Sequence, residues 1–272
     1  MFDIPRLDFN IAYACNLACK GCISLSDFDR KGVEDFDSVK EQIEQWSKML
    51  NPKVITLFGG EPLLHPRLHE IIKHIRKAWS GATVRLITNG YLLKKHDPKQ
   101  WFDYKPFEIQ VSIHRKDHEK MITAEIKKII SQSDKWIVKR ITEKDHKDII
   151  FTIKDFSIWK SRFDRFVTPY NTEGNMIVPF KSDPAKAHRI CGSPNTPVLY
   201  RNKLYKCPPI ANILDLPNAK GFKYTPYKLH DDLTEFVSKI GKPESICAMC
   251  PENTKHSFNH FDRSNVHVKH LD

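Results

Sequence analysis

Three cysteines near the N-terminus carry side chains that could bind one metal centre. Cys15, Cys19 and Cys22 follow one another with the spacing C-x3-C-x2-C. Three thiols in so short a loop cannot all pair as disulfides, whereas three thiolates can converge on zinc or on an iron–sulfur cluster. Tetrahedral zinc requires a fourth protein ligand, and the next histidine along the chain is the distant His65. A cubane cluster with three cysteine ligands keeps one iron open, so the spacing favours a reactive centre.

A second motif follows the next apolar segment of the chain. Gly59-Gly60-Glu61-Pro62 comes directly after the apolar run that ends at Phe58. Alone, such a motif is also typical of an ordinary turn between a strand and a helix. Placed after the three cysteines, it resembles the GGEP segment of the radical S-adenosylmethionine (SAM) enzymes, which holds the amino group of the methionine moiety.

The resemblance implies an enzyme with radical chemistry. In that family the open iron of a 4Fe-4S cluster binds SAM, and one electron cleaves the cofactor. The resulting 5′-deoxyadenosyl radical removes a hydrogen atom from a substrate. An external electron donor such as flavodoxin or ferredoxin is the implied partner. The sequence departs from the family at Gly21, because the residue before the third cysteine is usually aromatic and lies near the adenine. Other groups are therefore expected to hold the adenine.

Four further cysteines stand in the C-terminal part of the chain, and they could form a second site. These are Cys191, Cys207, Cys247 and Cys250. Two β-prone runs, 198–201 and 204–206, lie between the first two cysteines and predict a hairpin connected at 202–203. A hairpin returns the chain, so its two flanking cysteines can approach each other. The last two cysteines form a C-x2-C pair, which is suited to one metal. From the residues alone, zinc and an iron–sulfur cluster both fit.

The order of these elements resembles the Twitch region of radical SAM enzymes, a short form of the SPASM domain. The layout is similar to that of the family's aminocyclitol dehydrogenases. The resemblance implies a second, auxiliary 4Fe-4S cluster held by all four C-terminal cysteines. Since four thiolates saturate such a cluster, no iron is expected to bind substrate, and the cluster is expected to accept an electron.

Four polar residues at predicted strands are further site candidates. Ser112 stands where related enzymes carry V-S-x-D-G, which implies its contact with the SAM carboxylate or ribose, but His114-Arg115 replaces the Asp-Gly of that segment. His114 could accept a proton, because imidazole titrates near neutral pH. Arg140 lies in an otherwise apolar run, and the SAM carboxylate is its candidate partner. Asn89 is predicted to contact the ribose. The alternative for each is an ordinary structural or solvated role.

The histidines near the C-terminus have no spacing that fits a tight metal site. We interpret them as part of a solvated tail; they include His256, His260, His267 and His270.

The composition indicates a globular protein with a basic surface. The chain has 272 residues and a formal net charge of +11, which favours an anionic substrate or partner such as a phosphate or nucleotide. Lysines scattered over solvated helix faces are the alternative explanation. No apolar run approaches the length of a membrane span, and no signal-peptide segment is visible. We therefore expect no membrane partner and a reducing cytoplasm, where thiolates remain available.

Strands and helices alternate along the first part of the chain, which predicts an α/β fold with a parallel sheet. Strands are expected at 7–12, 53–58, 83–88, 107–113, 136–142, 149–154 and 163–168, and helices at 37–50, 66–79 and 117–131. Asp37 is the expected N-cap of the first helix, and Pro66 is expected in the first turn of the second. The resemblance implies a partial (β/α)6 TIM barrel.

Prolines become frequent after about residue 170, and this change suggests two regions. We expect a radical SAM core over residues 1–170 and a small auxiliary-cluster region over residues 171–272. The second region should contain the β-hairpin and a helix at 231–240 that ends at Gly241.

The leading functional hypothesis is a radical SAM oxidoreductase that acts on a small polar molecule such as a sugar, cyclitol or nucleotide. A dehydrogenation is favoured, because the auxiliary cluster can take the second electron. A peptide maturase is the alternative enzyme, although the chain lacks the length and cysteines for a recognition domain or a third cluster. An epimerase would need a hydrogen donor, usually cysteine, and all seven cysteines are assigned. An RNA-binding iron–sulfur or zinc protein is the alternative from another class. The sequence shows no RNA-recognition motif, so nucleic acid is not expected as a partner.

Overall fold

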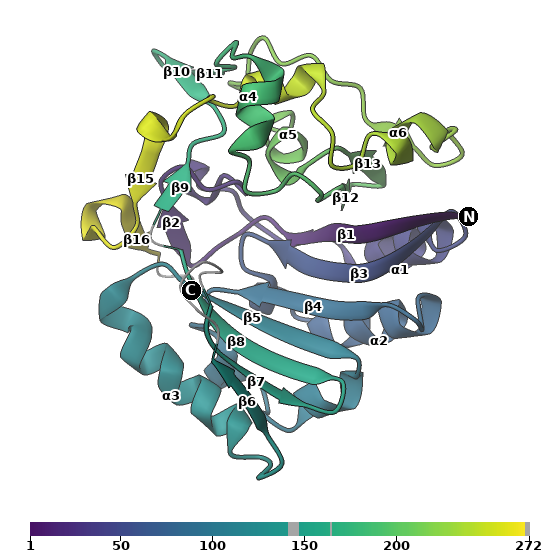
Figure 1. The fold of residues 1–272 in the computed structure, drawn as a ribbon, viewed down its shortest axis with the longest axis vertical. Coiled ribbons are helices and arrows are strands. Elements are labelled where there is room, and N and C mark those ends of the chain that lie inside the picture. Colours follow the sequence, from purple (N-terminus) through teal and green to yellow (C-terminus); the bar gives the residue numbers. More distant parts are fainter. Residues whose placement is uncertain (141–146, 164, 270–272) are drawn as a thin grey trace.

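A twisted sheet of parallel strands forms the centre of the molecule (Figure 1). The computed structural model describes residues 1–140, 147–163 and 165–269. Within this part of the chain, six neighbouring strands run parallel in the order β12, β1, β3, β4, β5 and β8. Their bounds are β1 Phe2–Ala12, β3 Leu50–Gly59, β4 Thr83–Thr88, β5 Phe107–Ile113, β8 Phe156–Arg162 and β12 Val198–Tyr200.

Antiparallel strands extend this sheet at both edges. Strands β7 (Lys147–Ile153) and β6 (Ile137–Arg140) follow β8 at one edge, and β13 (Lys203–Tyr205) and β14 (Tyr227–Lys228) follow β12 at the other. Three short pairs lie outside the sheet: β2 with β16, β9 with β15, and β10 with β11. Their bounds are β2 Leu17–Cys19, β9 Arg165–Val167, β10 Asn171–Glu173, β11 Met176–Val178, β15 Ser257–Asn259 and β16 Val266–Val268.

Three amphipathic helices cover the parallel strands. They are α1 (Phe36–Trp46), α2 (Leu68–Ala78) and α3 (Glu119–Ile130). Each buries apolar residues at helical spacing, for example Ile122, Ile126 and Ile129 in α3. Their buried side chains join those of the strands in one hydrophobic core. Shorter helices follow in the C-terminal part: α4 (Pro184–Arg189), α5 (Pro208–Ile213) and α6 (Thr234–Ser238).

This architecture confirms the predicted α/β class, and the curved, open parallel sheet is consistent with a partial barrel. The loops that follow β1, β3, β4 and β5 all leave the carboxyl ends of parallel strands. Those ends meet at one edge of such a sheet, where α/β proteins of this kind place their sites.

Several predicted element boundaries were wrong, and each has a local cause. The N-cap of α1 is Asp35 and not Asp37, because the Asp35 carboxylate accepts the N–H of Ser38. Pro66 precedes α2, which begins at Leu68. The turn of the β12–β13 hairpin is Arg201-Asn202, one residue earlier than predicted, and both residues have positive φ.

The strands after α3 also differ from the expected βα units. Strands β6, β7 and β8 form an antiparallel meander, and β8 supplies the parallel neighbour of β5. The predicted strand at 163–168 is reduced to β9, which pairs with β15 outside the sheet. Helix α6 is shorter than the predicted helix, although Gly241 beyond it has the positive φ expected of a helix terminus.

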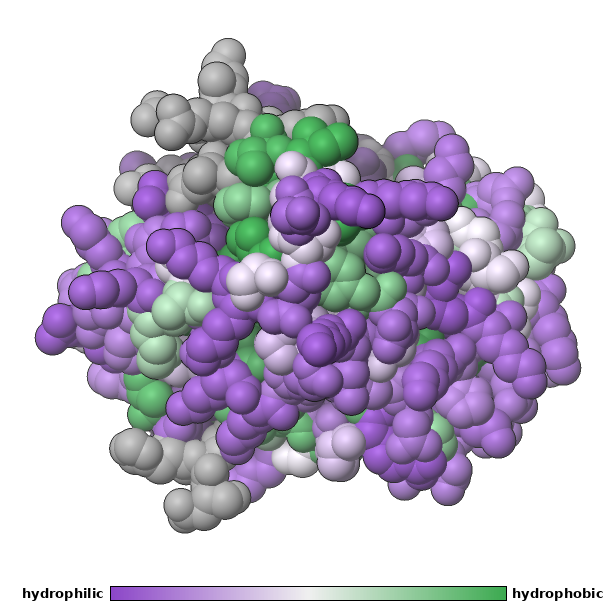
Figure 2. Space-filling view, turned by 90° about the horizontal axis from the view of Figure 1, so that it is seen from below, coloured by the Kyte–Doolittle hydropathy of each residue, from purple (hydrophilic) through white to green (hydrophobic). Residues whose placement is uncertain are grey.

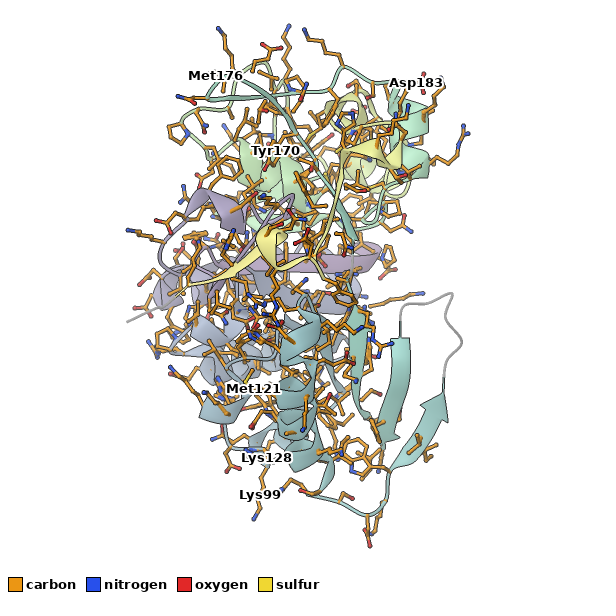
Figure 3. The ribbon with its side chains drawn as sticks, turned by 90° about the vertical axis from the view of Figure 1, so that its left-hand side faces the viewer. Lys99, Met121, Lys128, Tyr170, Met176 and Asp183 are labelled. Atoms are coloured by element: carbon orange, nitrogen blue, oxygen red, sulfur yellow. The ribbon has the colours of Figure 1, made fainter. Side chains whose placement is uncertain are left out.

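The two predicted regions share one sheet, because β12 of the second region pairs with β1 of the first, with Val198 opposite Asp8. Tyr170, at the predicted boundary, is buried, and its hydroxyl donates to Asp27 at 3.1 Å (Figure 3). The division of the chain at residue 170 stays a prediction.

The molecular surface agrees with the polar composition. The face in Figure 2 is largely hydrophilic, with apolar side chains gathered mainly near its upper centre. Among the described residues, no helix combines the length and the apolar character that a bilayer crossing requires.

Candidate functional site

The cysteine loop between β1 and α1 rests on the two glycines of the GGEP segment. The Gly60 N–H donates to the carbonyl of Ala12 at 2.7 Å, and the Glu61 N–H donates to that of Ala14 at 2.9 Å. A Cβ atom at Gly60 would lie only 2.1 Å from the Ala14 oxygen, and one at Gly59 would lie 2.2 Å from the Ala12 oxygen. Both positions therefore require glycine, since any side chain would push the cysteine loop away.

Glu61 holds the neighbouring loop in place through its buried carboxylate. This carboxylate accepts the N–H groups of Leu63 and Asn89 and the hydroxyl of Thr88, at 3.0, 2.8 and 2.7 Å. Burial raises the pKa of Glu61 to about 7. Its oxygens thus already accept three protein donors, and the SAM contact of the segment 59–62 stays a prediction.

Asn89 connects this loop to the cysteines. Its side-chain amide donates to the Asn16 oxygen at 2.8 Å and lies 3.7 Å from the Cys15 sulfur. The predicted ribose contact of Asn89 stays a prediction, and the structure adds a role in orienting the cysteine loop.

The three N-terminal cysteines line one cavity of about 230 Å³. Gly59, Gly60, Asn89, Ser112 and His114 line the same cavity. All three thiols are free. Burial raises the pKa of Cys15 to about 12 and raises the pKa of Cys19 and of Cys22 as well. Thiols in such a site keep their protons until a cation replaces them, so this donor set fits a metal cluster.

Ser112 and His114 lie where the sequence predicted them, at the end of β5 beside the cysteines. Ser112 is buried. Burial, with a contribution from His260, lowers the pKa of His114 to about 3, so its imidazole is neutral at pH 7. The His114 ring lies 5.9 Å from the ring of Phe163 and 5.4 Å from that of Phe166. The sequence analysis missed these two aromatic residues, which stand beyond the end of β8.

Arg140 is the last residue of β6, the outer strand at the far edge of the sheet. Its side chain lies outside the part of the structure that is described, so its predicted contact with SAM stays a prediction.

The C-terminal segment covers the cysteine loop, which corrects the interpretation of a solvated tail. Strand β16 pairs with β2 in a register that places Val266 opposite Cys19, and β15 pairs with β9. His260 is fully buried, whereas His256 and His267 are exposed as expected; His270 lies outside the described residues. The covering segment also explains Gly21, where a Cβ would lie 2.9 Å from Thr168 Oγ1 and 3.1 Å from Phe258. No aromatic side chain would fit at that position.

The four C-terminal cysteines also line a single cavity, of about 400 Å³. Cys191, Cys207 and Cys247 each act electrostatically on the thiol of Cys250 and, with burial, raise its pKa. Burial raises the pKa of Cys207 to about 12. The predicted hairpin is what brings Cys207 back toward Cys191. Four converging thiols fit a metal or a cluster, and this geometry is compatible with both.

A buried ion pair supports this second group of cysteines, and the sequence analysis did not anticipate it. Lys206 donates to the Glu244 carboxylate at 2.5 Å and to the Lys242 carbonyl at 2.8 Å, and its side chain is 7% exposed. The Glu244 carboxylate also accepts the N–H of Cys247. The pair thus ties the hairpin to the C-x2-C loop.

The two cavities are neighbours that share part of their lining. Both are lined by Ile23, Phe163, Phe166, Gly192 and Ser193. The two groups of cysteines therefore face a common wall, on which two aromatic rings lie 5.8 Å apart.

A comparison with protein families identifies the class to which this site belongs. Residues 9–160 match the radical SAM superfamily, a match that runs from the end of β1 into β8 and covers the cysteine loop and the GGEP segment. The chain belongs to the radical SAM superfamily. Membership implies SAM and one 4Fe-4S cluster as cofactors, and the cavity beside Cys15, Cys19 and Cys22 has the donors for them.

Particular relatives agree with this class. A GTP 3′,8-cyclase from Tolumonas auensis is 31% identical over 125 residues, which are 44% of this chain and 37% of the relative. An S-adenosylmethionine-dependent nucleotide dehydratase from Flammeovirga pacifica is 29% identical over 153 residues, 54% of this chain and 47% of the relative. The matches thus span less than half the length of these relatives.

Solved structures were also compared with the chain, and similarity to one of them extends over most of its length. BtrN in complex with AdoMet and 2-DOIA is similar with a TM-score of 0.55 and 16% identity, over 93% of this chain and 97% of BtrN. At this identity the similarity concerns the fold alone.

Proposed function

We propose that this chain is a radical SAM oxidoreductase that removes hydrogen from a small, polar, anionic substrate with the help of two iron–sulfur clusters. The observation that carries this proposal is that two neighbouring thiol-lined cavities share one wall. Cys15, Cys19 and Cys22 would hold one cluster, and the four C-terminal cysteines would hold the Twitch-type auxiliary one. When bound, the first cluster and SAM supply a carbon-centred radical, and the auxiliary cluster supplies an electron acceptor.

The chain's own residues would bind and orient the reactants and exclude water. Asn89, Ser112 and the backbone at 59–60 offer polar groups on the wall of the first cavity. Phe163 and Phe166 shield the space between the two cavities. His114 Nδ1 is buried and has no hydrogen-bond partner among the described residues, so it can accept a hydrogen bond from a substrate hydroxyl. Its low pKa makes it a weak base, and its role as the proton acceptor stays a prediction.

Two observations favour a nucleotide-like substrate over a sugar or cyclitol. The formal net charge of +11 favours an anionic molecule. The relatives from Tolumonas auensis and Flammeovirga pacifica are named for reactions of GTP and of nucleotides. Dehydrogenation is proposed over cyclisation or dehydration because four thiolates saturate the second site and leave electron transfer as its simplest task.

The first experiment tests the cofactors. Anaerobically reconstituted protein should contain about eight irons and, when reduced with dithionite, release 5′-deoxyadenosine from SAM. The variant Cys15→Ala/Cys19→Ala/Cys22→Ala should lose this release and keep about half the iron. SAM cleavage by this variant would refute the assignment of the first site. Stoichiometric zinc in place of its remaining iron would refute the auxiliary cluster.

The second experiment tests the reaction class with nucleotides as probes. Cys250→Ala should cleave SAM in the absence of substrate but lose substrate oxidation, because only the auxiliary site is changed. Equal loss of both activities would refute an electron-accepting role. Hyperfine coupling between a substrate nucleus and the auxiliary cluster would instead support the peptide-maturase alternative. A salt-sensitive mobility shift with tRNA, without SAM cleavage, would support the RNA-binding alternative.

A further inference from the structure

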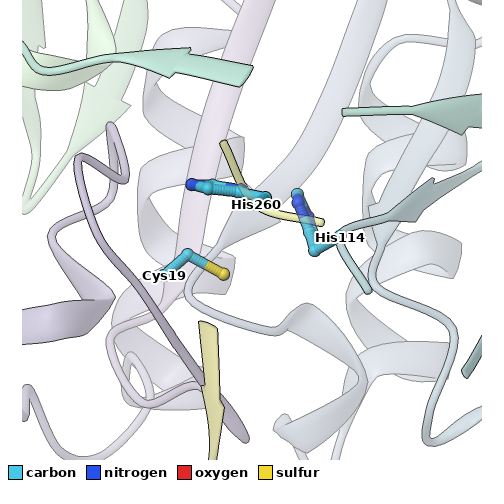
Figure 4. Close-up of side chains that lie close together, drawn as sticks. All are labelled: Cys19, His114 and His260. Carbon is cyan, nitrogen blue, oxygen red and sulfur yellow. The ribbon is translucent and has the colours of Figure 1, made fainter. Parts of the chain in front are cut away.

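Cys19 has two histidine neighbours that come from distant parts of the chain. Figure 4 shows His114 and His260 beside Cys19. The sulfur of Cys19 and one ring nitrogen of each histidine all lie within 4.8 Å of one another. Cys19 is 4% exposed and His260 is fully buried. His114 is partly exposed and lines the first cavity together with Cys19, so three metal-binding groups meet beside this cavity.

Separate backbone elements hold each of these three side chains. Cys19 ends β2, which β16 fixes by pairing. His114 follows the end of β5. The His260 ring is anchored because its Nε2 lies 2.9 Å from the Lys20 carbonyl and because it packs edge-on against Phe166, with ring centroids 4.2 Å apart. The grouping thus results from the tertiary structure and not from one flexible loop.

We propose that Cys19, His114 and His260 form a zinc site in the cluster-free protein, and that zinc and the iron–sulfur cluster compete for Cys19. Thiolate and imidazole are both ligands that zinc takes, whereas a cubane requires thiolates. Tetrahedral zinc places such donors roughly 3.3 to 3.6 Å apart, so the three groups would draw together by about 1 Å. Cys15 and Cys22 line the same cavity, and either thiol or a water molecule can complete the coordination.

The competition rests on the proposed cluster, whereas the zinc site itself does not. A zinc ion bound to Cys19 would occupy one of the three cluster ligands, so it would have to dissociate before the cluster is assembled. The order in which the metals arrive would then decide whether the chain becomes active.

Cobalt is a suitable probe, because Co²⁺ takes zinc sites and its thiolate complexes absorb strongly. We would titrate cluster-free protein anaerobically with Co²⁺. The protein carries Cys247→Ser and Cys250→Ser, because these changes weaken metal binding at the second site. We expect one tightly bound cobalt with the spectrum of a four-coordinate thiolate complex. In this background His114→Ala and His260→Gln should each weaken binding at least about tenfold, since each loses one ligand. The exposed His256→Ala is the matched control and should bind cobalt unchanged. Unchanged binding by both His114→Ala and His260→Gln would overturn the proposal, and far-ultraviolet circular dichroism verifies that each variant folds.

A second measurement tests the competition. Iron–sulfur reconstitution is followed by absorbance near 400 nm, with and without one equivalent of zinc. The factor by which zinc slows reconstitution should be roughly tenfold larger for the wild-type protein than for His260→Gln. Equal slowing in both proteins would overturn the competition. Failure of zinc-free wild-type protein to cleave SAM would refute the proposed function but leave the cobalt result standing, so the two failures are distinguishable.

Discussion

Arg30 joins the segment after the cysteine loop to the C-terminal part of the chain, and its removal should destabilise the protein markedly. The guanidinium donates to the Tyr200 hydroxyl at 2.6 Å and to the Asp215 carboxylate at 2.8 Å, and it also contacts Asn212. Its side chain is 7% exposed and lies over the ring of Tyr13, 5.3 Å from the ring centroid. Arg30 is therefore a buried cation with several partners.

The loss of stability in Arg30→Met depends on the buried groups that lose their partner. Removal of one member of a buried ion pair typically costs about 3–5 kcal/mol. Here Asp215 keeps a second partner, because Arg201 contacts its other oxygen, and the Asp215 side chain is 21% exposed. We therefore expect a loss of about 3 kcal/mol in the free energy of unfolding, at the lower end of that range. For a chain of this size the loss corresponds to a fall of about 6–10 °C in Tm.

Equilibrium unfolding in urea, under anaerobic and reducing conditions, measures this quantity on cluster-free protein. Arg201→Met is the matched control, because it removes the other cation from the same carboxylate at a site where the side chain is 50% exposed. Arg201→Met should lower the free energy of unfolding by less than about 1 kcal/mol. If Arg30→Met lost no more stability than Arg201→Met, our reasoning on the buried network would be wrong.

Three further changes test other parts of the site. Lys206→Met should lower the iron content of the auxiliary site at least about twofold, because Glu244 and the Cys247 loop lose their buried cation. Iron analysis compares it with the control Lys203→Met, which changes an exposed lysine. Gly60→Ala should lower the free energy of unfolding by about 3 kcal/mol or more, because its Cβ would collide with the Ala14 backbone. Gly81→Ala is the control, because there is open space around Gly81, and thermal melts compare the two variants. Glu61→Gln tests pH dependence. The raised pKa of Glu61, about 7 against an ordinary 4.5, contributes stability that is present below pH 4.5 and is lost as pH rises through 7. The stability of wild type relative to Glu61→Gln should therefore fall by about 2.5 kcal/mol between pH 5 and pH 8, and parallel pH curves would contradict this.

The parallel core of the fold was predictable because its signals are local. Strands β4 and β5 have the predicted bounds, since both alternate buried and partly buried residues along a short, uninterrupted run. The antiparallel meander after α3 was missed for a physical reason. The turn between β7 and β8 uses Asp155 with positive φ and contains no glycine or proline, so a single Asp is the only turn signal in the sequence there.

The candidate site was predictable where its residues share a motif. The cysteine spacing and the two glycines of GGEP are constraints within short segments, and they led directly to the first cavity. His260 was misinterpreted because its burial depends on the pairing of β15 with β9 and of β16 with β2. Lys206 and Glu244 were missed for the same reason, since only the folded hairpin brings them together. Such long-range pairing leaves no periodic pattern in either partner segment.

The pairing of β16 with β2 has a consequence for how the protein is made. Residues 17–19 leave the ribosome early, but the strand that covers them is synthesised long after them. During translation the thiols of Cys15, Cys19 and Cys22 are therefore open to solvent and to metal carriers. Once residues 257–268 have emerged, the strand pairs can form and cover one side of the loop, so that the thiols are then reached through the first cavity. Metal delivered during translation thus meets a more open cysteine loop than metal delivered to the folded protein.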